Sequence, residues 1–347
     1  MILTLLLFIV ILGSIVLVHE SGHFIFAKLV GVHVYEFSIG MGPVIFKKIA
    51  KDKTQYSIRA VPIGGFVSLA GEETDLDLEK QKGHNLQDKT VFQRFLVMVM
   101  GVVFNFIFAF VLLFVVGLLA KSPSMDPIIS DVAEGYPASL AGIEAGDRVL
   151  SINGKKVSYL DDISLYLAIE DLSKDVLIKV KKENGMVNEI KVLPEKVVSD
   201  EGESYVLGIS LSSKENPGFF NAIGYAFKKE ASIFKQMYVT ITGLFTGGIK
   251  VNQLSGPVGI YSVVGEMKTE GLVSILYLIA MLSVNVGVVN ALPFPAFDGG
   301  RILFLVIEKI KGSPVSPKVE NIIHSIGFIL LILLMLYVTF NDILRLF

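Results

Sequence analysis

The sequence predicts a polytopic α-helical membrane protein with four transmembrane helices, a membrane-associated β-hairpin region and an inserted extracytoplasmic α+β domain. Of its 347 residues, 52% are hydrophobic and 18% are charged, which is too apolar for an ordinary soluble protein. Four apolar runs are long enough to cross a bilayer, and a segment of soluble composition separates the second run from the third. The net charge of −2, without a basic cluster among aromatic residues, gives no reason to expect a nucleic-acid partner.

Hydropathy defines the four spans, and glycine, proline and charge define the segments between them. The expected segments are a first span (1–30), a cytosolic or membrane-associated β region (31–94), a second span (95–120), the inserted domain (121–211), an amphipathic helix and linker (212–270), a third span (271–300), a cytosolic loop (301–321) and a fourth span with the C-terminus (322–347).

The first span carries the most informative motif of the chain. No charged residue occurs from Met1 to Val18, a length of roughly 27 Å as a helix, and His19-Glu20-Ser21-Gly22-His23 follows directly. Helical spacing places His19 and His23 one turn apart, where two imidazoles can bind zinc while Glu20 faces the bound water. A structural histidine pair at the end of a membrane anchor is the alternative, but it does not explain Glu20. Because the chain has no cysteine, a metal must be held by His, Asp or Glu.

The β region contains three expected short strands separated by glycines: Val32–Phe37, Gln55–Ala60 and Gly65–Leu69. The hairpin around Gly64, Gly65 and Phe66 can hold an extended substrate by edge pairing, and an ordinary cytosolic hairpin is an equal alternative. The charged stretch from Glu72 to Lys82 is expected to be a solvated loop.

Polar residues mark the later spans. Asn105 is the one polar residue of the second span. It either forms a hydrogen bond between helices or is part of a site. Gly101, four residues earlier, allows the backbone of another segment to approach closely. After the third span, two prolines break the helix and two glycines free the backbone around Asp298, which makes this carboxylate the natural third metal ligand. His324, near the start of the fourth span, is expected to be an interfacial residue without a role.

The inserted domain shows a helix near Leu160–Ile169 and two strands, Val176–Val180 and Val187–Val192, joined by the turn Glu183-Asn184-Gly185. Its pattern resembles a PDZ domain. That resemblance implies that the loop formed by Gly135, Tyr136, Pro137 and Ala138 presents amides to a peptide carboxylate. The next segment, 212–250, is aromatic and carries Lys228, Lys229 and Lys235, as in a helix that lies on a membrane surface or packs against another helix.

The distribution of basic residues predicts the topology. Ten Lys or Arg lie between residues 28 and 94, and more follow the third span, whereas the N-terminal flank has none. The positive-inside rule therefore places both basic loops in the cytosol, and both termini and the inserted domain outside. His19, His23 and Asp298 then lie at similar depth near the cytosolic side.

Together, HESGH (19–23), GVVFN (101–105), LSGPVGI (254–260) and NALPFPAFDGG (290–300) resemble the site-2 protease family, in particular its bacterial RseP-type branch. The resemblance implies one zinc ion per chain on His19, His23 and Asp298, with Glu20 catalytic. It also implies that Asn105 and Asn290 contact the active site or the substrate. Two features differ from the family: Phe297 replaces the leucine before the aspartate, and there is room for one PDZ-like domain where the best-known relatives have two.

The resemblance further implies a membrane-embedded zinc metalloendopeptidase of the bacterial cytoplasmic membrane. Its expected partners are the lipid bilayer and single-pass membrane proteins already trimmed outside, such as anti-sigma factors, cut in regulated intramembrane proteolysis. A metal-ion transporter is the main alternative, because His and Asp within spans also mark ion paths. An inactive scaffold that binds peptides through the PDZ-like domain is the other. Oligomeric state, cleavage site and the PDZ ligand leave no signal in the sequence.

Overall fold

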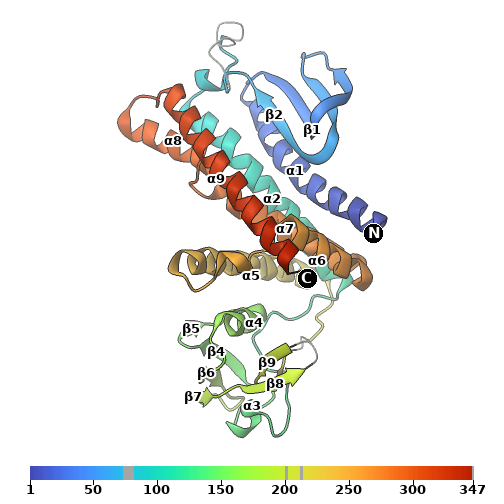
Figure 1. The fold of residues 1–347 in the computed structure, drawn as a ribbon, viewed down its shortest axis with the longest axis vertical. Helices are drawn as coiled ribbons and strands as arrows, with labels where there is room; N and C mark the ends of the chain where they lie inside the picture. The colour runs from blue at the N-terminus through green and yellow to red at the C-terminus, as the bar shows by residue number, and fades with distance from the viewer. Residues whose placement is uncertain (73–81, 200–201, 212–213, 346–347) are drawn as a thin grey trace. The chain divides into compact units, whose positions relative to one another are not determined.

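The computed structural model describes residues 1–72, 82–199, 202–211 and 214–345 (Figure 1). Its internal contacts divide the chain into two units. We call residues 1–112 and 251–347 the membrane unit and residues 113–250 the inserted unit.

Within the described residues, four helices are long and apolar enough to cross a membrane. They are α1 (Ile2–Leu29), α2 (Val91–Leu119), α7 (Leu272–Ala291) and α9 (Pro317–Leu344). Each overlaps one predicted span, although α7 ends at Ala291, well before the predicted end of the third span at residue 300. The prediction of four helices of membrane-spanning length is confirmed. Many large apolar side chains of α9, among them Leu333 and Leu336, are exposed, as expected of a surface that lipid covers.

Buried apolar side chains join the elements of the membrane unit. One cluster, which includes Ala27, Leu69 and Val97, brings α1 and α2 together with the hairpin strands β1 (Val34–Ile49) and β2 (Gln55–Leu69). A second cluster, which includes Ile15 and Leu278, packs α1 against α7 and the additional helix α6 (Pro257–Glu270). The HExxH helix is therefore held on two sides.

The hairpin differs from its prediction. Two long antiparallel strands replace the three short ones, since the second and third predicted strands are parts of β2 and the first extends to Ile49. The glycines do not end the strands, because the ladder absorbs them through repeated register shifts. At Gly40, with φ of 85°, an added Cβ would lie 2.6 Å from the Val61 carbonyl oxygen. Of the expected charged loop, residues 73–81 lie outside the described part of the chain.

Two segments contain more helix than predicted. The segment 212–270, expected to be an amphipathic helix and a linker, contains α5 (Phe219–Thr246), and its linker part contains the short 3-10 helix Val251–Gln253 and α6. The loop expected at 301–321 is largely α8 (Asp298–Lys311), which begins at the predicted ligand itself. Pro257 stands at the first turn of α6, where proline is well tolerated.

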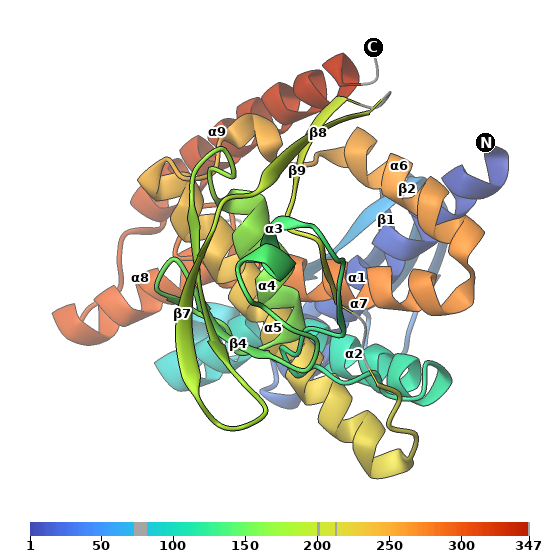
Figure 2. The ribbon, with the colours of Figure 1, turned by 90° about the horizontal axis from the view of Figure 1, so that it is seen from below.

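The inserted unit contains a four-stranded antiparallel sheet in the order β5-β4-β6-β7. These strands are β4 (Arg148–Ile152), β5 (Lys155–Lys156), β6 (Val176–Lys181) and β7 (Val187–Val192). Helix α4 (Leu160–Ile169) packs against β4 (Figure 2), and α3 (Pro137–Leu140) is a single turn. Two small ribbons pair β3 (Asp131–Val132) with β10 (Ile209–Ser210), and β8 (Glu195–Ser199) with β9 (Gly202–Val206).

Both local predictions for this unit are confirmed. The helix runs from Leu160 to Ile169 as expected, and β6 pairs with β7 across the predicted turn, with Lys181 opposite Val187. Alternation along β6 buries Val176, Ile178 and Val180 in the core of the unit. Helix α5 is fixed to α4 by polar contacts, including the ammonium of Lys229 at 2.8 Å from the Asp161 carboxylate.

Candidate metal centre

Helix α1 places the two motif histidines on one face, one turn apart. Both side chains are buried, and their Nε2 atoms lie 3.2 Å from each other. The opposite ring nitrogens have partners on α2: His23 Nδ1 lies 2.8 Å from the Val97 carbonyl oxygen, and His19 Nδ1 lies 3.3 Å from the Asn105 side-chain amide. Because a carbonyl oxygen only accepts, His23 Nδ1 carries the proton, and this contact orients the ring and leaves its Nε2 free to act as a ligand atom.

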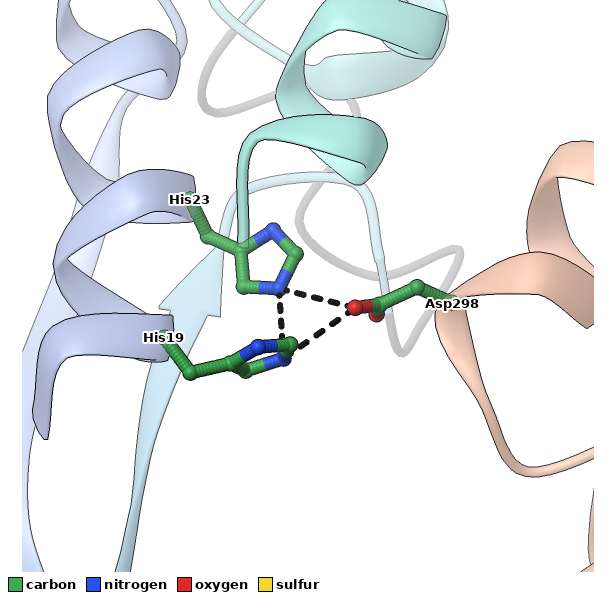
Figure 3. Close-up of side chains that lie close together, drawn as sticks. All are labelled: His19, His23 and Asp298. Carbon is green, nitrogen blue, oxygen red and sulfur yellow. Dashed lines mark hydrogen bonds and ion pairs between the residues drawn. The ribbon is translucent and has the colours of Figure 1, made fainter. Parts of the chain in front are cut away.

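Asp298 joins the two histidines from the opposite end of the sequence. Its Oδ2 lies 3.1 Å from His19 Nε2 and 3.2 Å from His23 Nε2 (Figure 3). That oxygen is buried, and in the described part of the chain it accepts no hydrogen bond. Three potential ligand atoms on α1 and α8 thus converge on one point.

The distances fit a small tetrahedral ion. Zinc–ligand bonds of about 2.0–2.1 Å separate two ligand atoms of a tetrahedron by about 3.3 Å. The three observed separations are 3.2, 3.1 and 3.2 Å. Two imidazole nitrogens and one carboxylate oxygen are also a donor set that zinc prefers. The residues present therefore fit a zinc ion.

Two glycines make room for this arrangement. A Cβ on Gly101 of α2 would lie 2.3 Å from His23 Nε2 and 2.9 Å from His19 Cε1. A Cβ on Gly22 of α1 would lie 2.2 Å from the Met100 carbonyl oxygen. The sequence indicated a close approach at Gly101. It did not indicate that the histidine rings occupy the space where a side chain at this position would lie. Gly22 stood inside the motif without an assigned role.

A cavity of about 610 Å³ opens beside the three ligand atoms. Of the predicted site residues, Glu20, Phe66 and Asn290 line it together with the histidines and Asp298. Val67 of β2 also lines the cavity. The hairpin and the motif helix therefore share one wall of the cavity.

Other predicted residues lie behind or beside this cavity. Asn105 is fully buried behind His19, and its backbone carbonyl accepts a hydrogen bond from the Ser283 hydroxyl on α7. Gly65 lies against β1, where a Cβ would meet the Ser38 carbonyl oxygen at 2.7 Å. Gly64, with φ of 84°, lies next to the Met41 side chain.

The loop of the inserted unit does not have the geometry expected of a carboxylate site. Tyr136 and Ala138 donate their amides to the carbonyls of Ala133 and Leu207, and Pro137 has no amide hydrogen. Gly135, with φ of 80°, is left as the turn residue before them. A carboxylate site needs a row of free amides, which this loop does not present in the structure described, and its role in binding a peptide carboxylate stays a prediction.

Two residues that the sequence did not single out also belong to the surroundings of the cavity. Arg301 follows Asp298 by one helical turn, lines the cavity and forms an ion pair with Glu72. Burial lowers the pKa of the Arg301 guanidinium from its ordinary value, although arginine stays charged in proteins. The i,i+3 spacing from Asp298 was the available signal. His324, expected to be interfacial, instead packs against the loop before Asp298.

The structure defines a polytopic membrane protein in which an HExxH helix and a distant aspartate form a candidate metal site beside a cavity. Comparison with known families gives the same class: the model of peptidase family M50 matches residues 7–334. The chain belongs to peptidase family M50, as the resemblance to site-2 proteases implied, and it is accordingly a peptidase by family.

Characterised and named relatives match over their whole length. The regulator of sigma-W protease RasP of Bacillus subtilis is 32% identical, and the alignment covers 99% of both chains. A putative zinc metalloprotease of Fusobacterium nucleatum is 37% identical over 99% of this chain and 100% of its own. The zinc metalloprotease RasP of Bacillus licheniformis is 32% identical, with 99% of both chains covered. These matches and the four apolar helices indicate a bacterial membrane protein.

Proposed function

We propose that this chain is an intramembrane zinc metalloprotease that cuts single-pass membrane proteins within or near their transmembrane segments. One observation carries the proposal: His19, His23 and Asp298 converge to within 3.2 Å of one another, beside a cavity that Glu20 also lines. The relatives named zinc metalloproteases support the choice of metal.

The three convergent side chains would hold one zinc ion through His19 Nε2, His23 Nε2 and Asp298 Oδ2. When bound, such an ion supplies Lewis acidity, which polarises a peptide carbonyl and lowers the pKa of a coordinated water to about 7. The Val97 carbonyl oxygen keeps the His23 proton on Nδ1 and so directs the lone pair of Nε2 inward. The Asn105 amide would hold His19 in the same tautomer with its oxygen, rather than its nitrogen, turned toward Nδ1. For Asn105 we therefore propose an orienting contact to His19 and no direct contact with substrate.

Glu20 is the proposed general base and acid. Its carboxylate lines the cavity next to the ligand atoms, so it can take a proton from the attacking water and return one to the leaving amine. Protein groups in such a role contribute about 10²–10⁴-fold to the rate.

The hairpin is the proposed support for an extended substrate. A transmembrane helix hides its carbonyls in internal hydrogen bonds, so a cut requires local unwinding. In the described residues the hairpin sheet has two strands, which leaves one edge of β2 without a partner strand. Phe66 of that strand lines the cavity, and Gly64 and Gly65 precede it, so an added substrate strand would run past the metal. Asn290, on the facing wall, can bind a substrate carbonyl.

Membrane orientation and the inserted unit complete the proposal. The basic flanks put the metal site near the cytosolic side, with both termini and the inserted unit outside. The antiparallel sheet and helix α4 agree with a PDZ-like unit, which would screen out substrates with bulky ectodomains. The name of the B. subtilis relative refers to sigma-W regulation, and it supports substrates of the anti-sigma-factor kind.

The test is cleavage in detergent of a tagged single-pass membrane protein with a shortened ectodomain. Wild type, Glu20→Gln and the exposed control Glu134→Gln are compared, and bound zinc is measured for each. We expect one zinc per chain in all three, normal cleavage by the control, and cleavage reduced by about 10²–10⁴-fold in Glu20→Gln.

Absence of zinc from wild type, or equal cleavage by wild type and Glu20→Gln, would contradict the proposal. In that event, zinc uptake by proteoliposomes distinguishes the transporter from the peptide-binding scaffold.

A further inference from the structure

The loop that delivers Asp298 receives a contact from the last membrane helix. The Ala296 amide donates a hydrogen bond to His324 Nδ1 of α9, at 3.0 Å. Ala296 stands two residues before the proposed ligand and has φ of 82°, a conformation that residues other than glycine rarely adopt. Such a conformation persists only where the surroundings of the residue hold it.

The hydrogen bond defines the state of the histidine ring. Because the Ala296 amide donates to Nδ1, this nitrogen carries the lone pair and the ring proton lies on Nε2. Nε2 is buried and, in the described part of the chain, has no hydrogen-bond partner; Glu320 Oε1 is 3.9 Å away. The single directed contact of the imidazole is therefore the one to the loop.

Gly327 brings α9 close enough for this contact. It lies one helical turn after His324, and a Cβ there would meet the Pro295 carbonyl oxygen at 2.6 Å and the Pro295 Cβ at 2.4 Å. The backbone of α9 thus packs directly on Pro295 and Ala296. The strained residue is held between a helix surface and a ring nitrogen.

The two ends of α8 are fixed in different ways. Toward its C-terminal end, Glu308 accepts a hydrogen bond of 2.9 Å from the Arg94 guanidinium of α2. Asp298, at its first turn, has no hydrogen bond to its inward oxygen. The position of that carboxylate therefore depends on the backbone around it, which packs through Gly299 and Gly300 and which His324 contacts through Ala296.

We propose that His324 is a positioning residue for the metal site: through Ala296 it holds the Asp298 carboxylate at the point where His19 and His23 converge. This inference rests on the proposed function, because it assumes that the three side chains bind zinc.

A matched pair of substitutions isolates the acceptor atom. In His324→Asn the side-chain Oδ1 stands as many bonds from the backbone as Nδ1 does in histidine, so it can accept from Ala296. His324→Leu has nearly the same size and shape as asparagine but offers no acceptor. Zinc affinity of the purified full chain is measured by competition with a chelator, and the unfolding temperature of the zinc-free protein is measured in parallel.

We expect His324→Leu to weaken zinc binding by about 10-fold or more, as the loss of an outer contact to a metal site usually does, and His324→Asn to stay within about 3-fold of wild type. Equal affinity of the two variants would overturn the inference, because packing alone would then explain the histidine. If wild type itself binds no zinc, the proposed function fails before this comparison is made.

Hydrogen exchange of the wild-type Ala296 amide provides a test that needs no variant. In the zinc-free protein, we expect this amide to exchange slowly, as a buried hydrogen-bonded amide does. Exchange of this amide as fast as in an unstructured loop would overturn the inference. This test does not depend on whether His324→Leu folds.

Discussion

Two aspartates with buried carboxylate oxygens, one in each unit, show what separates a structural carboxylate from the candidate ligand. In the inserted unit, Asp147 is 1% exposed, accepts a hydrogen bond from the Glu144 amide at 3.0 Å and pairs with the Lys182 ammonium at 3.0 Å. In the membrane unit, Asp298 directs an unpartnered oxygen at two imidazoles. Burial of a carboxylate alone therefore does not indicate function. The candidate ligand is distinguished by a buried oxygen that accepts no hydrogen bond.

The chemistry of burial explains this difference. A buried carboxylate is costly unless hydrogen bonds and an opposite charge compensate it, and Asp147 has both. Asp298 faces histidine nitrogens whose other ring atoms already have partners on α2. A cation at the point of convergence would supply the missing compensation.

The same isosteric change at both aspartates should give opposite results. Asp298→Asn removes a charged ligand atom, so we expect zinc affinity to fall by more than about 100-fold, beyond the usual effect of an outer contact. Asp147→Asn should leave zinc affinity unchanged and lower the unfolding free energy of the inserted unit by about 3 kcal/mol, because a buried ion pair is broken. Chelator competition and hydrogen exchange of the inserted unit measure the two effects. Zinc binding that survives in Asp298→Asn would break the comparison.

A smaller change tests how closely α2 borders the site. In Gly101→Ala the new methyl group would lie 2.3 Å from His23 Nε2, so one helix or ring must move. We expect zinc affinity to fall by about 10–100-fold. Gly13→Ala is the matched control, since a Cβ at Gly13 of α1 has no neighbour within 4 Å. Equal zinc affinity of the two variants would show that the histidines do not depend on the contact with α2.

The sequence predicted those parts of the fold that local patterns encode. Hydropathy located the four membrane helices, and helical spacing placed His19 beside His23. In the inserted unit, Glu183-Asn184-Gly185 specified its hairpin because this turn chemistry is local. The position of Asp298 at the end of a broken helix indicated its place in the site.

Contacts between distant residues were not predictable in this way. Asn105 meets His19 across 86 positions, and His324 meets Ala296 across 28, so neither pair leaves a periodic signal. Helix α8 was missed because its first turn contains Gly299 and Gly300, which favour a loop. These glycines are buried against the Ala291 and Phe294 backbone, where a side chain does not fit. The tertiary packing overrides their local preference.

Glu230 of α5 extends the comparison to a carboxyl without a partner. This carboxyl of the inserted unit is half-buried and, among the described residues, forms no hydrogen bond or ion pair. Burial raises the pKa of Glu230 from its usual 4.5 to about 7. Between these values the folded chain keeps a proton that the unfolded chain releases, so stability falls as pH rises from about 4.5 to 7 and is constant above.

We therefore expect Glu230→Gln to stabilise the inserted unit by about 1 kcal/mol at pH 8, a modest value because the partly exposed carboxylate is screened by water. At pH 4.5 the variant and wild type should be equally stable. Hydrogen exchange of the α4 and α5 amides in the full chain at both pH values measures the effect. A gain of the same size at pH 4.5 would show that ionisation is not its cause, and a loss of stability at pH 8 would reveal a favourable contact of the ionised group. Asp147, whose charge has a partner, should show the reverse at pH 8. Asp147→Asn is expected to lose stability where Glu230→Gln gains it. This opposition follows from the presence or absence of a partner for the charge.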